Sequence, residues 1–199
     1  MPIRAVFFDV MDTLVHDPFR DVMPSFLGLT LDELIRVKHP TAWVDFELGR
    51  IDEARFLELF LPGREWDPIG FCRAVRGAYR WLPGIEPMLS ELRGQDDRPG
   101  LYALSNYTPW YAWIDAECGL SRYLDHAFVS YQTGVRKPDP EAYLVPCRAL
   151  DLDPRDALFV DDRPSNCDAA RAVGMDAIVF RGEDDLRADL ARRGLVRAR

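Results

Sequence analysis

Phe7-Phe8-Asp9-Val10-Met11-Asp12-Thr13-Leu14-Val15 is the stretch of sequence that decides the fold. The apolar run that begins at Ala5 predicts a buried strand, and it brings Asp9 to the end of that strand, where a polar turn follows. In open α/β sheets, ligands bind outside the carboxyl ends of the strands, so Asp9 lies where a catalytic carboxylate would be placed. An aspartate that merely ends a strand explains this stretch, taken alone, equally well.

The composition bounds the class of protein. The 199 residues are 48% hydrophobic, which is enough for a substantial core in one domain with an insertion, or in two small domains. The net charge of -8 argues against a nucleic-acid partner, because nonspecific binding to nucleic acid needs a basic surface. No apolar run approaches the length of a membrane span, and the first residues lack the pattern of a signal peptide. We therefore expect no membrane partner and a cytoplasmic location.

From Pro83 onward, short apolar runs alternate with longer amphipathic stretches. The predicted strands of this part are residues 101–104, 127–129, 157–160 and 177–180. Asp139-Pro140 provides an N-cap and a first-turn proline for one helix, and Pro164 starts another that ends near Gly174. Together with the first strand, this β-α series predicts an α/β fold with a Rossmann-like parallel sheet and helices on both faces.

Residues 16–81 have a different pattern, in which nothing indicates a strand. Thr30-Leu31-Asp32-Glu33 is a capping-box signature, and Asp67-Pro68 marks another helix start. We therefore predict an α/β core formed by residues 1–15 and 82–199. A helical cap, residues 16–81, is inserted directly after the first strand.

Two further segments place polar side chains beside the predicted strand ends. Leu104-Ser105-Asn106 puts a hydroxyl and an amide where they can bind phosphate oxygens, although a plain Ser/Asn turn explains them as well. Arg136-Lys137-Pro138-Asp139-Pro140 holds Lys137 in a loop that two prolines stiffen. A fixed ammonium group there can neutralise a phosphate or a carboxylate, and the alternative is a solvated lysine at a helix entry.

Phe159-Val160-Asp161-Asp162-Arg163-Pro164 ends a predicted strand on two adjacent carboxylates. These carboxylates repel each other unless a cation lies beside them. Oxygen ligands from one or two carboxylates are the usual protein environment of Mg²⁺ at a phosphoryl site. Asp162 also suits the N-cap of the helix that starts at Pro164, and the two roles are compatible.

These segments, taken together and in this order, resemble the haloacid dehalogenase superfamily over nearly the whole chain. The residues that carry the resemblance are Asp9 with Thr13, Ser105, Lys137, and Asp161-Asp162 with Asn166. A helical insertion after the first strand is similar to the type-one cap of this family. The resemblance implies that Asp9 attacks phosphorus and forms an aspartyl-phosphate, which water then hydrolyses.

The resemblance also assigns roles to other residues at the strand ends. It implies that Mg²⁺ is held by Asp9, Asp162 and the backbone carbonyl of Met11, while Asp161 supports the metal site through water. It assigns Ser105 and Lys137 to phosphoryl binding, while Asn106 and Arg163 either contact the substrate or support the residues that do.

One position departs from the family pattern. Family phosphatases usually carry a second aspartate two residues after the nucleophile, which protonates the leaving group and activates water, and here that residue is Met11. Methionine cannot transfer protons, and losing a general acid typically costs roughly 10²–10⁴-fold in rate. Either Asp12, where the family usually has glycine, takes over this role, or the leaving group needs little assistance, or the protein is a slow or non-hydrolytic relative. The alternatives are a metal-free 2-haloacid dehalogenase, which the acidic pair Asp161-Asp162 disfavours, and a catalytically weak binding or regulatory protein.

Three segments resemble the plant plastid flavin mononucleotide (FMN) hydrolases in particular, and one of them lies in the cap. They are Asp9-Val10-Met11-Asp12-Thr13, Lys38-His39-Pro40-Thr41-Ala42-Trp43 and Arg136-Lys137-Pro138-Asp139-Pro140. This resemblance implies a small phosphorylated metabolite as substrate, with FMN as the leading candidate and sugar phosphates and nucleotides still open. Trp43 either contacts the substrate or packs in the core beside Phe46. The aromatic run 107–113 either packs between the cap and the core or stacks against a planar substrate.

Overall fold

The structure of the protein, a computed structural model that describes residues 2–197, is built on a parallel β-sheet. Within the described residues the sheet has five strands in the order β3-β2-β1-β4-β5, and every neighbouring pair is parallel. The strands are β1 (Ala5–Phe8), β2 (Gly100–Ser105), β3 (His126–Val129), β4 (Ala157–Asp161) and β5 (Asp176–Val179). The predicted parallel sheet is therefore confirmed, with strand ends within two residues of those expected.

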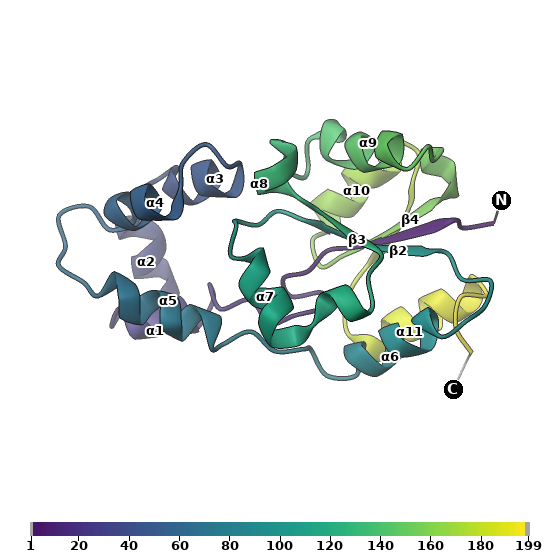
Figure 1. The fold of residues 1–199 in the computed structure, drawn as a ribbon, viewed down its shortest axis with the longest axis horizontal. Coiled ribbons are helices and arrows are strands. Elements are labelled where there is room, and N and C mark those ends of the chain that lie inside the picture. Colours follow the sequence, from purple (N-terminus) through teal and green to yellow (C-terminus); the bar gives the residue numbers. More distant parts are fainter. Residues whose placement is uncertain (1, 198–199) are drawn as a thin grey trace.

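Helices cover both faces of the sheet, as predicted. Because side chains alternate along a strand, Val6 and Phe8 pack with one cluster of buried residues and Phe7 with another. On one face lie α6 (Ile85–Arg93), α7 (Tyr111–Cys118) and α11 (Glu183–Arg192), and on the other α9 (Pro140–Ala149) and α10 (Pro164–Ala172). Figure 1 shows α9 and α10 above the sheet and α6 and α11 below it. The shorter elements are α8 (Ser130–Thr133) and the 3-10 turns Leu120–Arg122 and Pro154–Asp156.

Two of the predicted helix starts behave differently in detail. Asp139 caps α9 as expected, since its side chain accepts a hydrogen bond from the Glu141 backbone N–H. The prediction that Asp162 caps α10 is wrong. The N-cap residue is Arg163, and its own backbone N–H donates to Asp161 Oδ1 at 2.8 Å. Asp162 lies one residue before the N-cap position. The carboxylate that bonds to the N-cap residue is that of Asp161.

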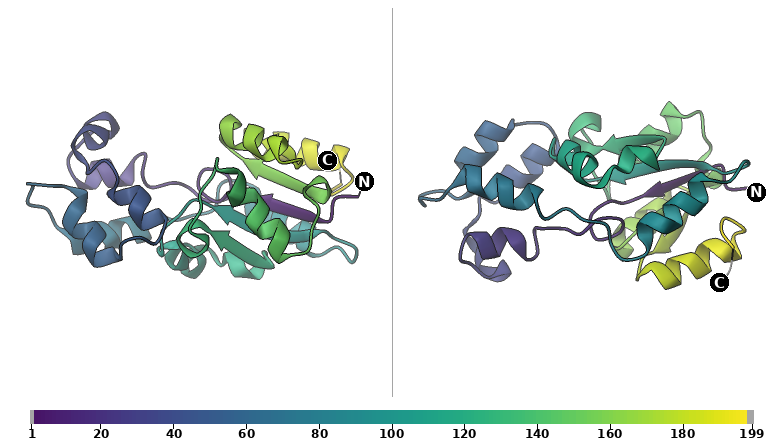
Figure 2. Two further views of the ribbon diagram at one scale, coloured as in Figure 1. Left: turned by 90° about the horizontal axis from the view of Figure 1, so that it is seen from above. Right: turned by 60° about the horizontal axis from the view of Figure 1, so that its bottom comes forward.

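A block of helices follows β1 in the chain and lies beyond the carboxyl ends of the strands (Figures 1 and 2). Its helices are α1 (Val22–Phe26), α2 (Leu31–Val37), α3 (Ala42–Glu47), α4 (Glu53–Phe60) and α5 (Pro68–Arg76). The capping box at Thr30 is present at the start of α2, and Asp67 caps α5. No helix within residues 2–197 is both long and apolar enough to cross a membrane.

The two segments that join this block to the sheet lie side by side. The backbone N–H of His16 donates to the Arg80 carbonyl at 3.0 Å, and that of Leu82 donates to the Leu14 carbonyl at 2.9 Å. Val15 and Trp81 form an antiparallel bridge between them. The chain therefore leaves the sheet layer and returns to it at one place, next to the end of β1.

Candidate active site

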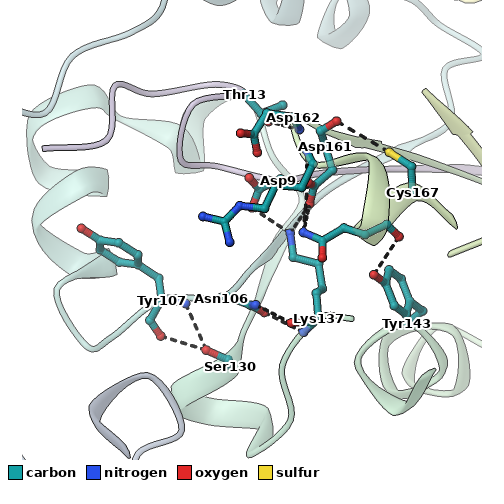
Figure 3. A network of polar contacts seen from close by, with 12 residues as sticks. Asp9, Thr13, Asn106, Tyr107, Ser130, Lys137, Tyr143, Asp161, Asp162 and Cys167 are labelled. Carbon is teal, nitrogen blue, oxygen red and sulfur yellow. Dashed lines mark hydrogen bonds and ion pairs between the residues drawn. The ribbon is translucent and has the colours of Figure 1, made fainter. Parts of the chain in front are cut away.

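Asp9, Lys137 and Asp161 form a buried ion-pair triad at the carboxyl ends of β1 and β4. Lys137 Nζ donates to Asp9 Oδ1 and to Asp161 Oδ2, at 2.7 Å in each case. The Lys137 side chain is 1% exposed and that of Asp161 is fully buried. Figure 3 shows the lysine rising between the two carboxylates. Three segments far apart in the sequence thus meet at one point, where the sequence predicted a functional site.

The charges of this triad hold one another in place. Burial raises the pKa of Asp9 above its ordinary value, and the nearby Lys137 ammonium group opposes that shift. Burial by itself would lower the pKa of Lys137, but the charges of Asp9 and Asp161 outweigh this effect and raise it. Lys137 is therefore a cation at neutral pH. Its charge offsets the repulsion between the two buried carboxylates of Asp9 and Asp161.

Asp161 is saturated by hydrogen bonds from the protein. Besides Lys137, its oxygens accept from Asn166 Nδ2 at 3.0 Å and from the backbone N–H of Arg163 at 2.8 Å. These bonds fix the carboxylate, and the carboxylate in turn fixes the ammonium group of Lys137. Asn166, which the resemblance singled out beside the acidic pair, is thereby brought into the same network.

The backbone of Lys137 is clamped by Asn106. Asn106 Nδ2 donates to the Lys137 carbonyl, and Asn106 Oδ1 accepts from the Lys137 N–H, both at 2.8 Å. Asn106 was predicted as a contact for the substrate, and it does line the pocket. Its amide is nevertheless committed to the main chain of Lys137 on both sides, so in this structure its role is to position the lysine.

Hard oxygen donors gather beside the triad. One carboxylate oxygen from each of Asp9, Asp161 and Asp162 lies within 4.8 Å of the others. The backbone carbonyl of Met11 accepts no hydrogen bond from any residue between 2 and 197. Carboxylate and carbonyl oxygens are the donors that Mg²⁺ prefers. Because Asp161 is taken up by its own hydrogen bonds, Asp9 and Asp162 are the members of this group whose carboxylates remain to hold a cation.

Asp12 does not point toward this chemistry. Its Oδ2 accepts from Arg20 Nε at 2.6 Å, and its Oδ1 accepts from the backbone N–H of Asp17 at 3.1 Å. Both oxygens are therefore held within the loop, which disagrees with the expectation that Asp12 transfers protons. Asp12 has φ of 56°, in the left-handed region, which explains why glycine is the usual residue there.

The remaining predicted site residues have different positions. Ser105 ends β2, and its buried Oγ has no hydrogen-bond partner among residues 2–197, so a phosphoryl-binding role stays a prediction. Arg163 is exposed and lines the pocket. Trp43 is half-buried in the pocket wall, whereas Phe46 is fully buried in the core.

The pocket above Asp9 is lined by residues from the helical block as well as from the sheet. Trp43 Nε1 donates to Glu47 Oε1 at 2.7 Å, and Glu47 Oε2 lies 3.1 Å from Arg136 Nη2. The ring of Phe19 lies 6.1 Å from that of Trp43. The lining residues that were not predicted include Asp17, Phe19 and Arg20. These three belong to an irregular connecting segment, for which the sequence offers no periodic or capping signal.

Comparison with known proteins agrees with this geometry. The family profile of haloacid dehalogenase-like hydrolases matches residues 3–174. The chain belongs to this family. This haloacid dehalogenase-like hydrolase is 39% identical over 194 residues to the chloroplastic flavin mononucleotide hydrolase 1 of Arabidopsis thaliana, covering 97% of this chain and 78% of the relative. It is also 30% identical over 204 residues to a glyceraldehyde 3-phosphate phosphatase of Pyrococcus abyssi, covering 90% of this chain and 82% of the relative.

Solved structures show the same fold. A haloacid dehalogenase family enzyme of Bacteroides thetaiotaomicron, in complex with magnesium and inorganic phosphate, superposes with a TM-score of 0.75 at 19% identity. The match covers 90% of this chain and 95% of that one. The family profile confirms the predicted superfamily, and the solved structure has the same α/β fold. The protein is a hydrolase with phosphatase-like relatives that act on small phosphorylated compounds.

Proposed function

We propose that the protein is a magnesium-dependent phosphatase that hydrolyses a small phosphomonoester through an aspartyl-phosphate on Asp9. The observation that carries this proposal is the Asp9–Lys137 pair at the end of β1, with 2.7 Å between Oδ1 and Nζ. Lys137 holds the Asp9 carboxylate in one orientation and leaves its second oxygen to attack phosphorus. The lysine cation then lies beside the phosphoryl oxygens as their charge develops.

Asp9, Asp162 and the carbonyl of Met11 would hold the magnesium ion. When bound, the ion neutralises phosphoryl charge and orients the phosphoryl group for in-line attack. The chain supports this assignment in two ways. Thr13 Oγ1 accepts from the Asp162 backbone N–H at 3.1 Å, which joins the two carboxylate-bearing segments. The Met11 carbonyl is left without a hydrogen bond from the described protein.

FMN is the leading candidate for the substrate. The 39% identical Arabidopsis relative, by its name, hydrolyses flavin mononucleotide. The pocket beyond Asp9 has an aromatic wall of Phe19, Trp43 and Tyr107, which suits a planar ring. We propose that residues 16–81 act as a cap, because two of these three aromatic residues come from that segment. The cytoplasmic location stays a prediction from the sequence.

The test is phosphate release from FMN, glyceraldehyde 3-phosphate and a nucleoside monophosphate, each with Mg²⁺ and with a chelator. We expect release that needs Mg²⁺ and is lost in Asp9→Asn, with FMN turned over most efficiently. Release that survives Asp9→Asn would rule out the aspartyl-phosphate. Chloride release from a 2-haloacid without metal would show a dehalogenase, and a folded protein inactive on every compound would support a binding or regulatory role.

A further inference from the structure

Hydrolysis of an alkyl phosphate needs a proton donor that the predicted residues do not supply. The leaving oxygen of such an ester is a strongly basic alkoxide, so a positioned acid accelerates its departure. Met11 cannot donate a proton, and both oxygens of Asp12 are engaged by Arg20 and by the Asp17 N–H. If the proposed function is correct, another side chain in the pocket must do this work.

Five acidic residues line the pocket: Asp9, Asp12, Asp17, Glu47 and Asp162. Asp9 and Asp162 belong to the nucleophile and metal positions. Glu47 is 5% exposed, with Oε1 bound by Trp43 Nε1 and Oε2 shut in beside Arg136. The acid that remains is Asp17.

One oxygen of Asp17 is available to a ligand. Asp17 Oδ1 accepts from the backbone N–H of Phe19 at 3.0 Å. Asp17 Oδ2 accepts no hydrogen bond from any group among residues 2–197, and it is not fully buried. Asp17 is half-buried and lines the same pocket as Asp9. Asp17 therefore offers one carboxylate oxygen that no described group occupies, on a residue that lines the pocket.

The backbone of Asp17 is linked to Asp162 through Asp12 and Arg20. Its N–H donates to Asp12, and Arg20, which pairs with Asp12, also lies 3.6 Å from Asp162 Oδ2 through Nη2. Asp12 thus anchors the loop that carries Asp17. This arrangement gives the left-handed Asp12 a structural purpose, and it ties the position of Asp17 to the acidic end of β4.

We propose that Asp17 is the general acid and base of this enzyme, taking the role that Met11 cannot fill. This inference rests on the proposed phosphatase function. In the first step a bond forms between Asp9 and phosphorus, the bond from phosphorus to the alkyl oxygen breaks, and the Asp17 proton passes to that oxygen. In the second step Asp17 takes a proton from the water that attacks phosphorus. The bond between Asp9 and phosphorus breaks, and inorganic phosphate is released. Asp17 is then protonated again and ready for the next cycle.

The surroundings of Asp17 suit this work. Burial raises the pKa of Asp17 to about 6, close to the pH at which an acid–base group is most effective. The neighbouring Asp12 also raises it, whereas the Phe19 N–H and the cations Arg20 and Arg163 lower it. The other titratable groups that interact with Asp17 are Glu47, Tyr79 and Tyr107.

Asp17→Asn tests the proposal, because asparagine keeps an oxygen for the Phe19 N–H and removes only the titratable proton. Two substrates are compared: FMN, whose leaving group needs protonation, and 4-nitrophenyl phosphate, whose leaving group does not. We expect kcat/KM for FMN to fall roughly 10²–10³-fold and that for 4-nitrophenyl phosphate to fall less than about tenfold. Asp21→Asn is the matched control, since Asp21 is exposed at the start of α1, lies outside this pocket and can be replaced by an equally good capping residue.

The pH dependence gives a readout that a structural role would not move. The ratio of wild-type to Asp17→Asn kcat/KM for FMN should fall with pH above about 6, because wild type loses its proton donor there and the variant has none to lose. An equal loss on both substrates, a ratio independent of pH, or no loss at all would overturn the proposal. Phosphatase activity that needs Asp9 but survives Asp17→Asn would leave the proposed function standing and remove only this inference.

Discussion

The side-chain amide of Asn106 and the backbone of Lys137 form a closed pair of hydrogen bonds, each 2.8 Å long. Asn106, which directly follows β2, thereby fixes the main chain of the loop that carries the Lys137 ammonium group. Both amide atoms are used, so no shorter or differently shaped side chain at position 106 can reproduce the contact.

We expect Asn106→Ala to lower kcat/KM by roughly 10–100-fold, because a reacting group displaced by about 1 Å can cost that much. The loss should appear mainly in kcat, since Lys137 acts on the developing charge. Gln132→Ala, an exposed amide on α8, is the control and should leave both constants unchanged. Kinetic constants that Asn106→Ala does not alter would show that Lys137 holds its position without the clamp.

Magnesium binding should be visible without any turnover. We expect saturating Mg²⁺ to raise the melting temperature by about 5–10 °C at a hundredfold excess over Kd, because an ion bound only by the folded state stabilises it. Asp162→Asn should abolish most of this shift. Asp156→Asn, which removes a carboxylate at the start of β4, should retain it. An undiminished shift in Asp162→Asn would place the ion elsewhere.

Trp43 should contribute to the recognition of a planar substrate. We expect Trp43→Leu to raise KM for FMN about tenfold, the loss of an aromatic contact worth about 1.4 kcal/mol. KM for glyceraldehyde 3-phosphate, which has no ring to stack, should change less than about twofold. Trp66→Leu is the matched control, because Trp66 packs against Phe60 and Phe71 and does not line the pocket. Equal increases for both substrates would assign Trp43 to the core alone.

Asp17 should cost the protein stability at neutral pH. Its pKa is raised from 3.8 to about 6, so its contribution to folding is most favourable below pH 3.8 and falls as the pH rises through about 6. We therefore expect Asp17→Asn to be more stable than wild type at about pH 7.5, by roughly 1–2 kcal/mol after allowance for its partial exposure. The difference should shrink at about pH 4.5. Denaturant unfolding at the two pH values measures it, and a difference independent of pH would contradict the raised pKa.

Local sequence signals were sufficient for most of the fold. Apolar runs located the five described strands, and Asp-Pro pairs located the starts of α5 and α9, because strand burial and helix capping depend on neighbours in the chain. The cap residue of α10 was predicted wrongly because the direction of the backbone decides which side chain reaches the start of the helix. Of two adjacent aspartates, the sequence could not tell which carboxylate points back to the helix.

The site was predictable where it lies on regular elements and not elsewhere. Asp9 and Lys137 were found because a strand end and a proline-stiffened loop put them in place. The orientation of Asp12 depends on its left-handed backbone conformation and on its ion pair with Arg20. Neither can be predicted from the pattern of residues in the sequence. Asp17 lines the pocket because of how its irregular connecting segment is bonded to Asp12, which no periodic pattern in the sequence records.

The pairing of the two connecting segments, Leu14 with Leu82 and His16 with Arg80, has a consequence for how such an enzyme can diversify. Everything between them enters and leaves through a single two-stranded stem. Insertions, deletions or replacement of the segment between His16 and Arg80 leave unchanged the distance between the two points where the chain leaves and re-enters the sheet layer. New substrate preferences can therefore arise by remodelling one contiguous stretch of the gene, which carries Asp17 with it, while Asp9, Lys137 and Asp161 at the strand ends are inherited unchanged.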